Sequence, residues 1–255
     1  MKRTIISGFS LFLLVLSFFI NGILFRASLY YYRLYLKSSL DPLGDDSTSS
    51  LVRESKVFRT PRIIFLGDSR ARYWPPPSSL RSTFLYDNYA VSGFTTSQVL
   101  AHFNRLSLAL SPRDIVVIQV GINDLKTIPF FLSDRDRITK LCSENISRLT
   151  SLIRDSGATV VLTTIIPTGT IPFYRRPIWP SSVEASLSQC NSEIKQLASD
   201  SVYILDTSML TDNSGRIPSK LQRNFLHISS PAYHLLNTKL SSILSSIPSQ
   251  RSHSN

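Results

Sequence analysis

The chain has 255 residues, of which 42% are hydrophobic and 18% charged, so it can bury a full core, and its composition excludes wholesale disorder. Its net charge is +11, but no basic run with interleaved aromatic residues and no nucleic-acid-binding motif occurs, which argues against a nucleic-acid partner. The positive excess suits an anionic polymer, a lipid headgroup or a wall surface, and charge alone does not decide between them.

An apolar stretch opens the chain. Residues 4–25 contain no charged side chain, and as a helix this stretch would rise about 33 Å, enough to cross a hydrocarbon core of about 30 Å. Lys2 and Arg3 precede it, and a cluster of tyrosines suited to the membrane interface follows it: Tyr30, Tyr31, Tyr32 and Tyr35. Because no small-x-small cleavage site is visible, we predict a retained transmembrane anchor with a juxtamembrane segment over residues 1–37.

The rest of the chain divides by composition. Residues 38–60 are polar and rich in serine, as a linker is. We expect a folded domain over residues 61–248 and a disordered tail over residues 249–255. Basic residues flank the apolar stretch on both sides, and we predict the N-terminus inside the cell and the folded domain outside it.

Strand-like and helix-like patterns alternate through the folded domain. Continuous apolar runs predict strands over residues 62–66, 84–91, 114–120, 159–166 and 202–205. Apolar residues at helical spacing predict helices over residues 95–110, 133–155, 182–198 and 230–247. This alternation predicts an α/β domain: a three-layer α/β/α sandwich with a mostly parallel, flavodoxin-like sheet of about five strands.

The two cysteines, Cys142 and Cys190, both fall in predicted helices and lack the C-x-x-C spacing of metal and redox sites. The pattern favours two buried free thiols, with a disulfide as the alternative if the domain is exported.

Three short motifs follow three of the predicted strands. Ser69 follows the strand over residues 62–66, Gly93 the next strand, and Asn123 the third. The carboxyl ends of parallel strands share one edge of the sheet, where ligands bind, and His227 lies in a loop that can return to this edge. A serine hydroxyl, glycine and asparagine amides, and an imidazole are the nucleophile, oxyanion donors and base that ester hydrolysis requires.

The blocks FLGDSR, NYAVSG and VGIND and the late histidine before Ser-x-Pro resemble the SGNH hydrolase superfamily, the GDSL-type esterases and lipases, over roughly residues 61–240. The resemblance implies that Ser69 is the nucleophile and His227 the general base. It also implies an oxyanion hole made by the amides of Ser69 and Gly93 and the side chain of Asn123. No P-loop, dinucleotide fingerprint or metal-ligand cluster occurs, so we predict no cofactor and no metal.

One position departs from the family pattern, which has an acid three residues before the histidine. Here that position is Asn224, whose carbonyl oxygen can orient an imidazole but supplies no charge. In a serine protease, the change from Asp to Asn in this role costs a factor of about 10⁴ in turnover. A backbone carbonyl or a nearby acid such as Asp212 could offset part of this handicap.

Arg70, Arg72 and Trp74 flank the nucleophile as possible substrate-binding residues. The arginines are either solvated or attract an anionic substrate, and the indole either stacks on a sugar ring or packs locally.

Three functions follow from these patterns. The first is a membrane-anchored serine esterase acting on a small acyl ester, a lysolipid or an acetylated glycan. The second is an O-acyltransferase that acts on envelope glycans. The third is a catalytically weakened, glycan-binding relative, which the asparagine at position 224 favours.

Overall fold

The computed structural model describes residues 8–44 and 60–247, in two compact units whose boundary lies between Ser39 and Leu40. In the first unit a single helix, α1 (Gly8–Leu40), has 33 residues. Its segment from Ser10 to Leu40 contains an 18-residue window with a mean hydropathy of 2.0 and is long and apolar enough to cross a membrane. The helix extends past the predicted end of the anchor at residue 37, whereas residues 45–59 of the predicted linker and the predicted tail lie outside the described residues.

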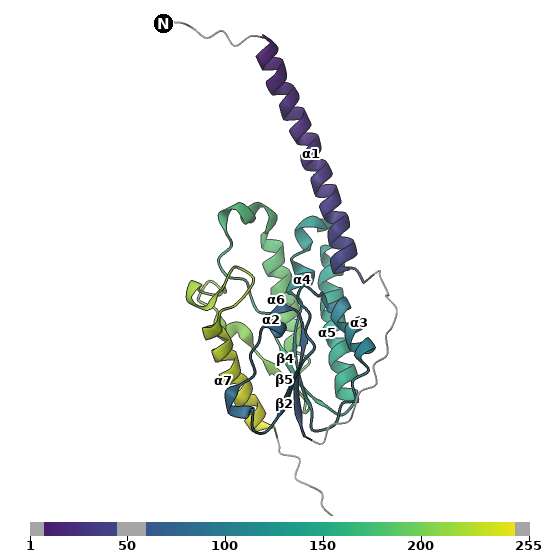
Figure 1. Cartoon of the computed structure of the whole chain (residues 1–255), viewed down its shortest axis with the longest axis vertical. Coiled ribbons are helices and arrows are strands. Elements are labelled where there is room, and N and C mark those ends of the chain that lie inside the picture. The colour runs from purple at the N-terminus through teal and green to yellow at the C-terminus, as the bar shows by residue number, and fades with distance from the viewer. Residues whose placement is uncertain (1–7, 45–59, 248–255) are drawn as a thin grey trace, which may run out of the picture. The chain divides into compact units, whose positions relative to one another are not determined.

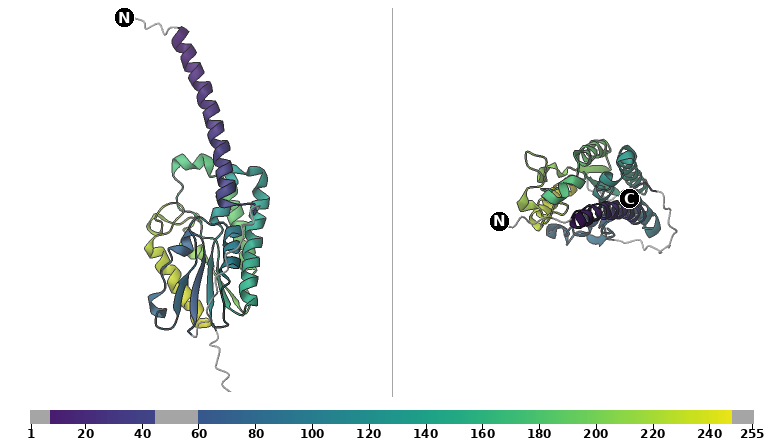
Figure 2. Two further views of the ribbon diagram at one scale, coloured as in Figure 1. Left: turned by 45° about the vertical axis from the view of Figure 1, so that its right-hand side comes forward. Right: turned by 90° about the horizontal axis from the view of Figure 1, so that it is seen from above.

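The second unit is built on a five-stranded sheet (Figures 1 and 2). Its strands are β1 (Arg62–Gly67), β2 (Leu85–Asn88), β3 (Ile115–Gln119), β4 (Thr159–Thr163) and β5 (Val202–Leu205). The strand order is β2-β1-β3-β4-β5 and every pairing is parallel, so the prediction of a flavodoxin-like sheet of about five strands is confirmed.

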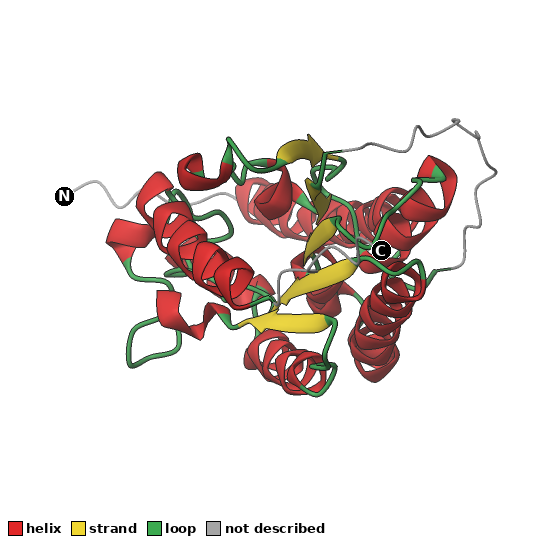
Figure 3. Cartoon of the chain, turned by 90° about the horizontal axis from the view of Figure 1, so that it is seen from below, coloured by secondary structure: helices red, strands yellow, loops and turns green. Residues whose placement is uncertain are grey.

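Helices cover both faces of the sheet, which lies between them in Figure 3. One face is covered by α3 (Thr96–Leu106), α5 (Arg135–Asp155) and α6 (Ser181–Lys195), and the other by α7 (Ser230–Ser246). Two short helices, α2 (Ser69–Arg72) and α4 (Ile122–Leu125), follow β1 and β3. The 3-10 turns are η1 (Ser78–Leu80), η2 (Ile128–Phe130), η3 (Leu132–Asp134), η4 (Phe173–Ile178), η5 (Thr207–Leu210) and η6 (Ser219–Leu221).

Successive strand residues face opposite layers, so each central strand is buried on both sides. Ile64 and Val116 pack with α3, α5 and α6, whereas Ile63 and Val117 pack with α7. Burial on both faces explains why these strands are continuous apolar runs rather than alternating ones. The free thiols of Cys142 and Cys190 are buried where α5 and α6 pack on this core.

Several elements are shorter than predicted: β4 ends at Thr163 rather than at residue 166, and α6 at Lys195 rather than at residue 198. The strand predicted over residues 84–91 covers only Leu85–Asn88, although the amides of Tyr89 (2.9 Å) and Val91 (3.0 Å) still donate to carbonyls of β1. The helix predicted to reach residue 110 ends at Leu106, because Ser107 adopts a left-handed conformation with a φ of 45°.

Candidate active site

Ser69 is the first residue of α2, at the carboxyl end of β1. The chain reaches it through Gly67, which has a φ of +141° and passes so close to β3 that a Cβ would lie 1.8 Å from the Gln119 carbonyl oxygen. Only glycine fits this crossing. Asp68 then caps the short helix by accepting a hydrogen bond from the Arg70 amide at 2.8 Å. The turn therefore fixes Ser69 at the switch point between β1 and β3, where open α/β sheets bind ligands.

His227 meets this serine although 158 positions separate the two in sequence. The distance from Ser69 Oγ to His227 Nε2 is 3.0 Å, within hydrogen-bond reach for proton transfer. The imidazole stands on a tight loop, in which the amides of Arg223 (2.8 Å) and Asn224 (3.2 Å) both donate to the His227 carbonyl oxygen. The structure thus brings together the two residues predicted as nucleophile and base.

Asn224 occupies the orienting position behind the imidazole. Its Oδ1 lies 3.1 Å from His227 Nδ1 and also accepts from the amides of Leu226 and His227, each at 2.9 Å. These amide donors identify Oδ1 as the carbonyl oxygen, so Nδ1 carries the proton it donates and Nε2 is left to accept one from Ser69. Asp212, the acid considered as a substitute, instead accepts bonds from Ser214 and Arg216 within its own loop.

The electrostatic environment of His227 favours its neutral form. Burial lowers the pKa of the imidazole, and the nearby positive charges of Arg70, Arg223 and Lys126 lower it further. A neutral imidazole at pH 7 can act as a general base without first losing a proton. The same cations, with no acid behind the ring, oppose the imidazolium that forms when Ser69 is deprotonated.

Gly93 and Asn123 face the same cavity from the ends of two other strands. Gly93 has a φ of +89°, and a Cβ on it would meet no atom within 4 Å, so its backbone is open to an approaching ligand. The Asn123 side chain is nearly buried: Lys126 Nζ donates to its Oδ1 at 2.6 Å, and its Nδ2 donates to the Phe94 carbonyl at 2.9 Å. Lys126 therefore fixes which end of the amide is the donor, and one N–H of Nδ2 remains for a ligand.

The buried carboxylate of Asp124 stabilises the turn that carries Asn123. Asp124 is 1% exposed and accepts three bonds from Thr96, two from its amide (3.1 and 3.0 Å) and one from its hydroxyl (2.6 Å). Burial raises the pKa of Asp124 to about 7, against the opposing effect of the Thr96 bonds. The bonds tie the turn after β3 to the start of α3, and so hold Asn123 and the loop containing Gly93 at a constant separation.

The three flanking residues predicted as possible substrate contacts have different positions. Arg70 is buried and lines the cavity, and it donates to the carbonyls of Leu226 (2.7 Å), Ile166 and Pro167; burial lowers its pKa to about 10. Arg72 is exposed, does not line the cavity, and donates to the Ala90 carbonyl (3.3 Å).

Trp74 is 2% exposed, and its Nε1 donates to Asn237 at 2.7 Å beneath α7. Its indole packs locally, which was one of the two expectations for this ring; the other, stacking on a sugar, is corrected because the ring is buried.

The cavity that joins these residues has a volume of about 470 Å³. It is lined by Ser69, Arg70, Tyr73, Ser92, Gly93, Ile122, Asn123, Lys126, Arg223, Asn224, Leu226 and His227. We call it the Ser69 cavity. Lys126 and Arg223 are site residues that the sequence reasoning missed. Their proximity to Asn123 and Asn224 in sequence was the available signal, but neither spacing shows which way a long side chain turns.

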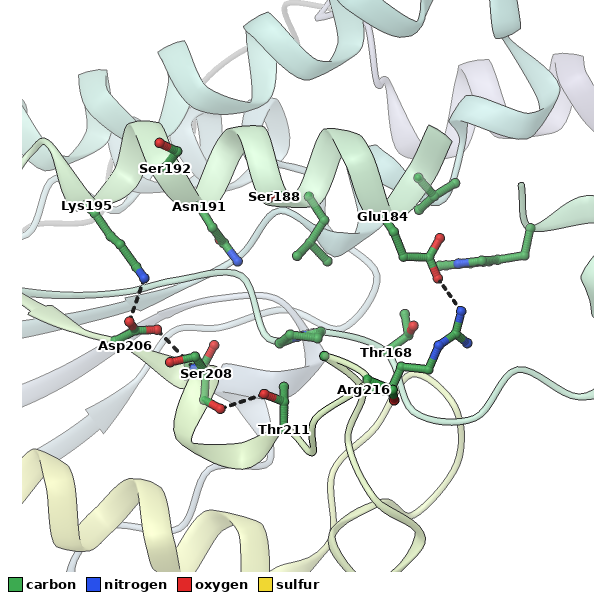
Figure 4. A pocket seen from close by; sticks show the side chains of 17 residues that line it. Thr168, Glu184, Ser188, Asn191, Ser192, Lys195, Asp206, Ser208, Thr211 and Arg216 are labelled. Carbon is green, nitrogen blue, oxygen red and sulfur yellow. Dashed lines mark hydrogen bonds and ion pairs between the residues drawn. The ribbon is translucent and has the colours of Figure 1, made fainter. Parts of the chain in front are cut away.

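A second cavity, shown in Figure 4, has a volume of about 540 Å³ and lies between α6 and the loops after β4 and β5. Ion pairs cross it: Lys195 with Asp206 at 2.6 Å and Arg216 with Glu184 at 3.2 Å. We call it the Lys195 cavity. It contains no histidine beside its serines, so it lacks a nucleophile and base pair. No group of three or more His, Cys, Asp or Glu side chains among the described residues is placed to hold a metal ion.

Comparisons with known proteins agree with this arrangement. An arylesterase from Vibrio mimicus is 35% identical over 115 residues, which cover 40% of this chain and 52% of the arylesterase, so the match spans about half the length of that curated relative. A GDSL-like lipase from Bacteroides thetaiotaomicron shares the fold, with 19% identity and a TM-score of 0.59 over 76% of this chain and 92% of that one. An acetyl xylan esterase does so with 15% identity and a TM-score of 0.55 over 72% and 99%.

The sequence model of the GDSL-like Lipase/Acylhydrolase family matches residues 65–235, a range that begins within β1 and ends within α7. This range holds the serine, both proposed oxyanion residues, the asparagine at position 224 and the histidine. The chain therefore belongs to the GDSL-like lipase/acylhydrolase family, within the SGNH hydrolase superfamily.

Proposed function

We propose that this protein is a serine ester hydrolase that works through an acyl-enzyme on Ser69. The observation that carries the proposal is the 3.0 Å contact between Ser69 Oγ and His227 Nε2, at the edge of the sheet where Asn123 also faces the cavity. Membership of an acylhydrolase family supports the reaction class.

The first half of the reaction transfers the acyl group to the enzyme. Ser69 Oγ attacks the carbonyl carbon of the ester while its proton passes to His227 Nε2. The resulting oxyanion is stabilised by the amides of Ser69 and Gly93 and by the N–H of Asn123 that bonds to none of the described residues. The intermediate then collapses: the bond to the alcohol oxygen breaks, and the proton on Nε2 passes to that oxygen as the alcohol leaves.

The second half releases the acid. A water molecule attacks the acyl carbon, its proton passes to His227 Nε2, and the same oxyanion donors stabilise the second intermediate. The bond from the acyl carbon to Ser69 Oγ breaks, and the proton returns to that oxygen. Asn224 Oδ1 holds the imidazole in one tautomer throughout, by accepting the bond from Nδ1.

We further propose that α1 anchors the protein in a membrane with its catalytic domain outside the cytoplasm. The length and apolar character of α1 support the anchor. For the orientation, Lys2 and Arg3 precede the apolar stretch, and positive charge marks the cytoplasmic side. A protease added to intact cells should degrade the domain if this orientation holds, and protection of the domain until the cells are lysed would contradict it.

Hydrolysis of p-nitrophenyl acetate by the full chain in detergent micelles tests the proposed reaction. We expect Ser69→Ala to lower turnover by about 10⁴-fold or more, whereas Ser208→Ala, which removes a serine hydroxyl in the Lys195 cavity, leaves turnover unchanged. Equal rates for wild type and Ser69→Ala would overturn the proposal.

A fluorophosphonate probe separates this function from its two alternatives. Labelling that requires Ser69 shows a reactive serine and excludes a glycan-binding relative without catalytic activity, because Ser69 Oγ must displace fluoride from the phosphorus. Adding a glycan acceptor to the ester assay then distinguishes hydrolysis from acyl transfer: free acetate supports the hydrolase, and an acetylated glycan supports the transferase.

A further inference from the structure

Positive charge gathers in the lining of the Ser69 cavity. Arg70, Lys126 and Arg223 line the cavity, and no aspartate or glutamate among the described residues does, because the nearby acids Asp68 and Asp124 are buried outside the lining. A neighbouring groove of about 580 Å³ shares Arg223 with this cavity, adds Arg175, and again has no acidic residue in its lining. The path that leads to the nucleophile is therefore lined with charge of one sign.

The hydrogen bonds of these cations go to neutral groups, although the buried carboxylate of Asp68 acts through space on Arg70 and Lys126, and that of Asp124 on Lys126. Lys126 Nζ donates to the amide oxygen of Asn123, and the Arg70 guanidinium donates to three backbone carbonyls. The exposed guanidinium of Arg223 has no hydrogen bond or ion pair with any part of the chain that the structure describes. In the Lys195 cavity, by contrast, Lys195 and Arg216 each have a carboxylate partner.

This arrangement opposes catalysis on a neutral substrate. The cations disfavour the imidazolium of His227, and Asn224 supplies no negative charge to offset them. An anion bound beside the ester would neutralise the cations and restore the basicity of the imidazole. It would also give Arg223 and Lys126 a hydrogen-bonded anion, which neither has among the described residues, and hydrogen bonds to charged groups are the stronger ones.

We propose, given the hydrolase function above, that the substrate is an ester carrying an anionic group, such as a phosphate, sulfonate or carboxylate, which Arg223 and Lys126 bind. Arg223 is the main specificity residue, because it faces both the cavity and the groove. Lys126 binds the anion from α4, on the side of Asn123.

Three acetyl esters of one shape and different charge test this proposal. The probes are 4-acetoxybenzenesulfonate (anionic), 4-acetoxy-N,N-dimethylbenzenesulfonamide (neutral) and 4-acetoxyphenyltrimethylammonium (cationic), assayed with the full chain in neutral detergent. We expect kcat/KM to be about tenfold higher for the sulfonate than for the sulfonamide, and lowest for the cation. The preference should weaken as the ionic strength rises from about 0.05 to about 0.5 M. Equal values for the sulfonate and the sulfonamide would overturn the inference.

Variants assign the preference to particular side chains. Arg223→Gln should lower the sulfonate-to-sulfonamide ratio by about fivefold, and Lys126→Gln, which keeps a donor near Asn123, should also lower it. Arg148→Gln is the matched control: this exposed arginine on α5 lies outside both linings, and its removal changes the net charge equally without changing the ratio. A ratio that falls equally in all three variants would overturn the local binding site.

Binding measured without turnover separates this inference from the proposed function. Calorimetric titration of the full-length Ser69→Ala variant should show tighter binding of the sulfonate than of the sulfonamide, lost in the Ser69→Ala/Arg223→Gln double variant. Absence of turnover with selective binding retained would sink the hydrolase proposal alone, whereas turnover without selectivity would sink only the inference.

Two natural esters then show whether the anionic group belongs to a lipid or to a glycan. Release of fatty acid from lysophosphatidylglycerol points to a lipid phosphate, and release of acetate from O-acetylated polygalacturonate points to a glycan carboxylate. Sensitivity of the release to Arg223→Gln supports the inference in either case, and release that Arg223→Gln leaves unchanged counts against it.

Discussion

The Ser69 cavity and the Lys195 cavity lie along one edge of one sheet, yet they differ in how their polar groups are satisfied. In the Lys195 cavity the charges are paired across the gap, lysine with aspartate and arginine with glutamate. In the Ser69 cavity the serine meets an imidazole, an asparagine keeps a spare N–H, and an arginine has no partner in the described chain. The ion pairs of the Lys195 cavity are half-exposed and contribute little stability, whereas the unpaired groups of the Ser69 cavity are available to a ligand.

The two cavities differ in a property that can separate an active site from a surface pocket. Both cavities are of similar volume and both contain serines, cations and an asparagine. Size and these shared residue types therefore do not distinguish them. The Ser69 cavity differs in having a histidine, and in that its donors and charges are not already used by the protein. Matched substitutions in the two cavities turn this property into measurable differences.

The two asparagines should give the largest contrast. Asn123→Ala removes an oxyanion donor and the bonds to Lys126 and Phe94, and we expect turnover to fall by about 10²- to 10³-fold and the free energy of unfolding by about 1–3 kcal/mol. Asn191 uses both ends of its amide on the backbone of Ile165, accepting at 2.6 Å and donating at 3.0 Å. Asn191→Ala should lower the free energy of unfolding by a similar amount and leave turnover of the folded enzyme unchanged. Ester assays and urea denaturation of both variants measure this, and similar losses of turnover would remove the distinction.

Two aspartates provide the next contrast. Asp124→Ala leaves the amide and hydroxyl of Thr96 without their acceptor inside the protein, and we expect the free energy of unfolding to fall by about 2–4 kcal/mol. Asp206 is part-exposed, pairs with Lys195 and caps η5 through the Ser208 amide, so Asp206→Ala should cost about 1 kcal/mol. Thermal and denaturant unfolding give both values, and an equal cost would show that the turn after β3 does not depend on its buried carboxylate.

Restoring the acid behind the imidazole should have a smaller, favourable effect. Asn224→Asp replaces a neutral acceptor of the Nδ1–H bond by a charged one, and we expect kcat/KM to rise about tenfold. Because the base must be neutral, kcat/KM of the wild type should increase with pH through a His227 pKa below about 6.5 and level off near neutrality. The new carboxylate raises that pKa, so the acid limb of the profile should move to higher pH. An unchanged rate with an unmoved profile would show that another group already fulfils the role of the acid.

The fold and the catalytic positions could be predicted because they follow local rules. Apolar runs fixed the strands, and the carboxyl ends of parallel strands share an edge, so Ser69, Gly93 and Asn123 were expected together before any distance was known. The end of α3 depends on one residue, Ser107, which adopts a left-handed backbone conformation. The spacing of apolar residues does not report the conformation of a single residue, so the predicted helix was too long.

The charged residues around the site could not be predicted, because long side chains take their positions from tertiary contacts. Arg70 follows the nucleophile directly, yet it is buried because carbonyls of Leu226 and Ile166, far away in sequence, converge on its guanidinium. Trp74 was equally ambiguous until α7 supplied Asn237 as its hydrogen-bond partner. Lys126 and Arg223 belong to separate elements that the fold brings to one cavity. Local patterns thus place the groups that react, and only the assembled domain places the charges that surround them.

The smallest expected effect belongs to the ion pairs of the Lys195 cavity. Lys195 and Asp206 are 49% and 39% exposed, and water competes with their 2.6 Å contact. Lys195→Met should therefore change the free energy of unfolding by less than about 1 kcal/mol and leave ester turnover unchanged. Denaturant unfolding and the p-nitrophenyl acetate assay measure both quantities, with Glu184→Gln as the parallel change in the second pair. A clear loss of turnover in either variant would mean that the Lys195 cavity acts on the Ser69 cavity through the loop after β4. Pro167 in this loop lines the Lys195 cavity, and its carbonyl oxygen accepts a hydrogen bond from Arg70, which lines the Ser69 cavity.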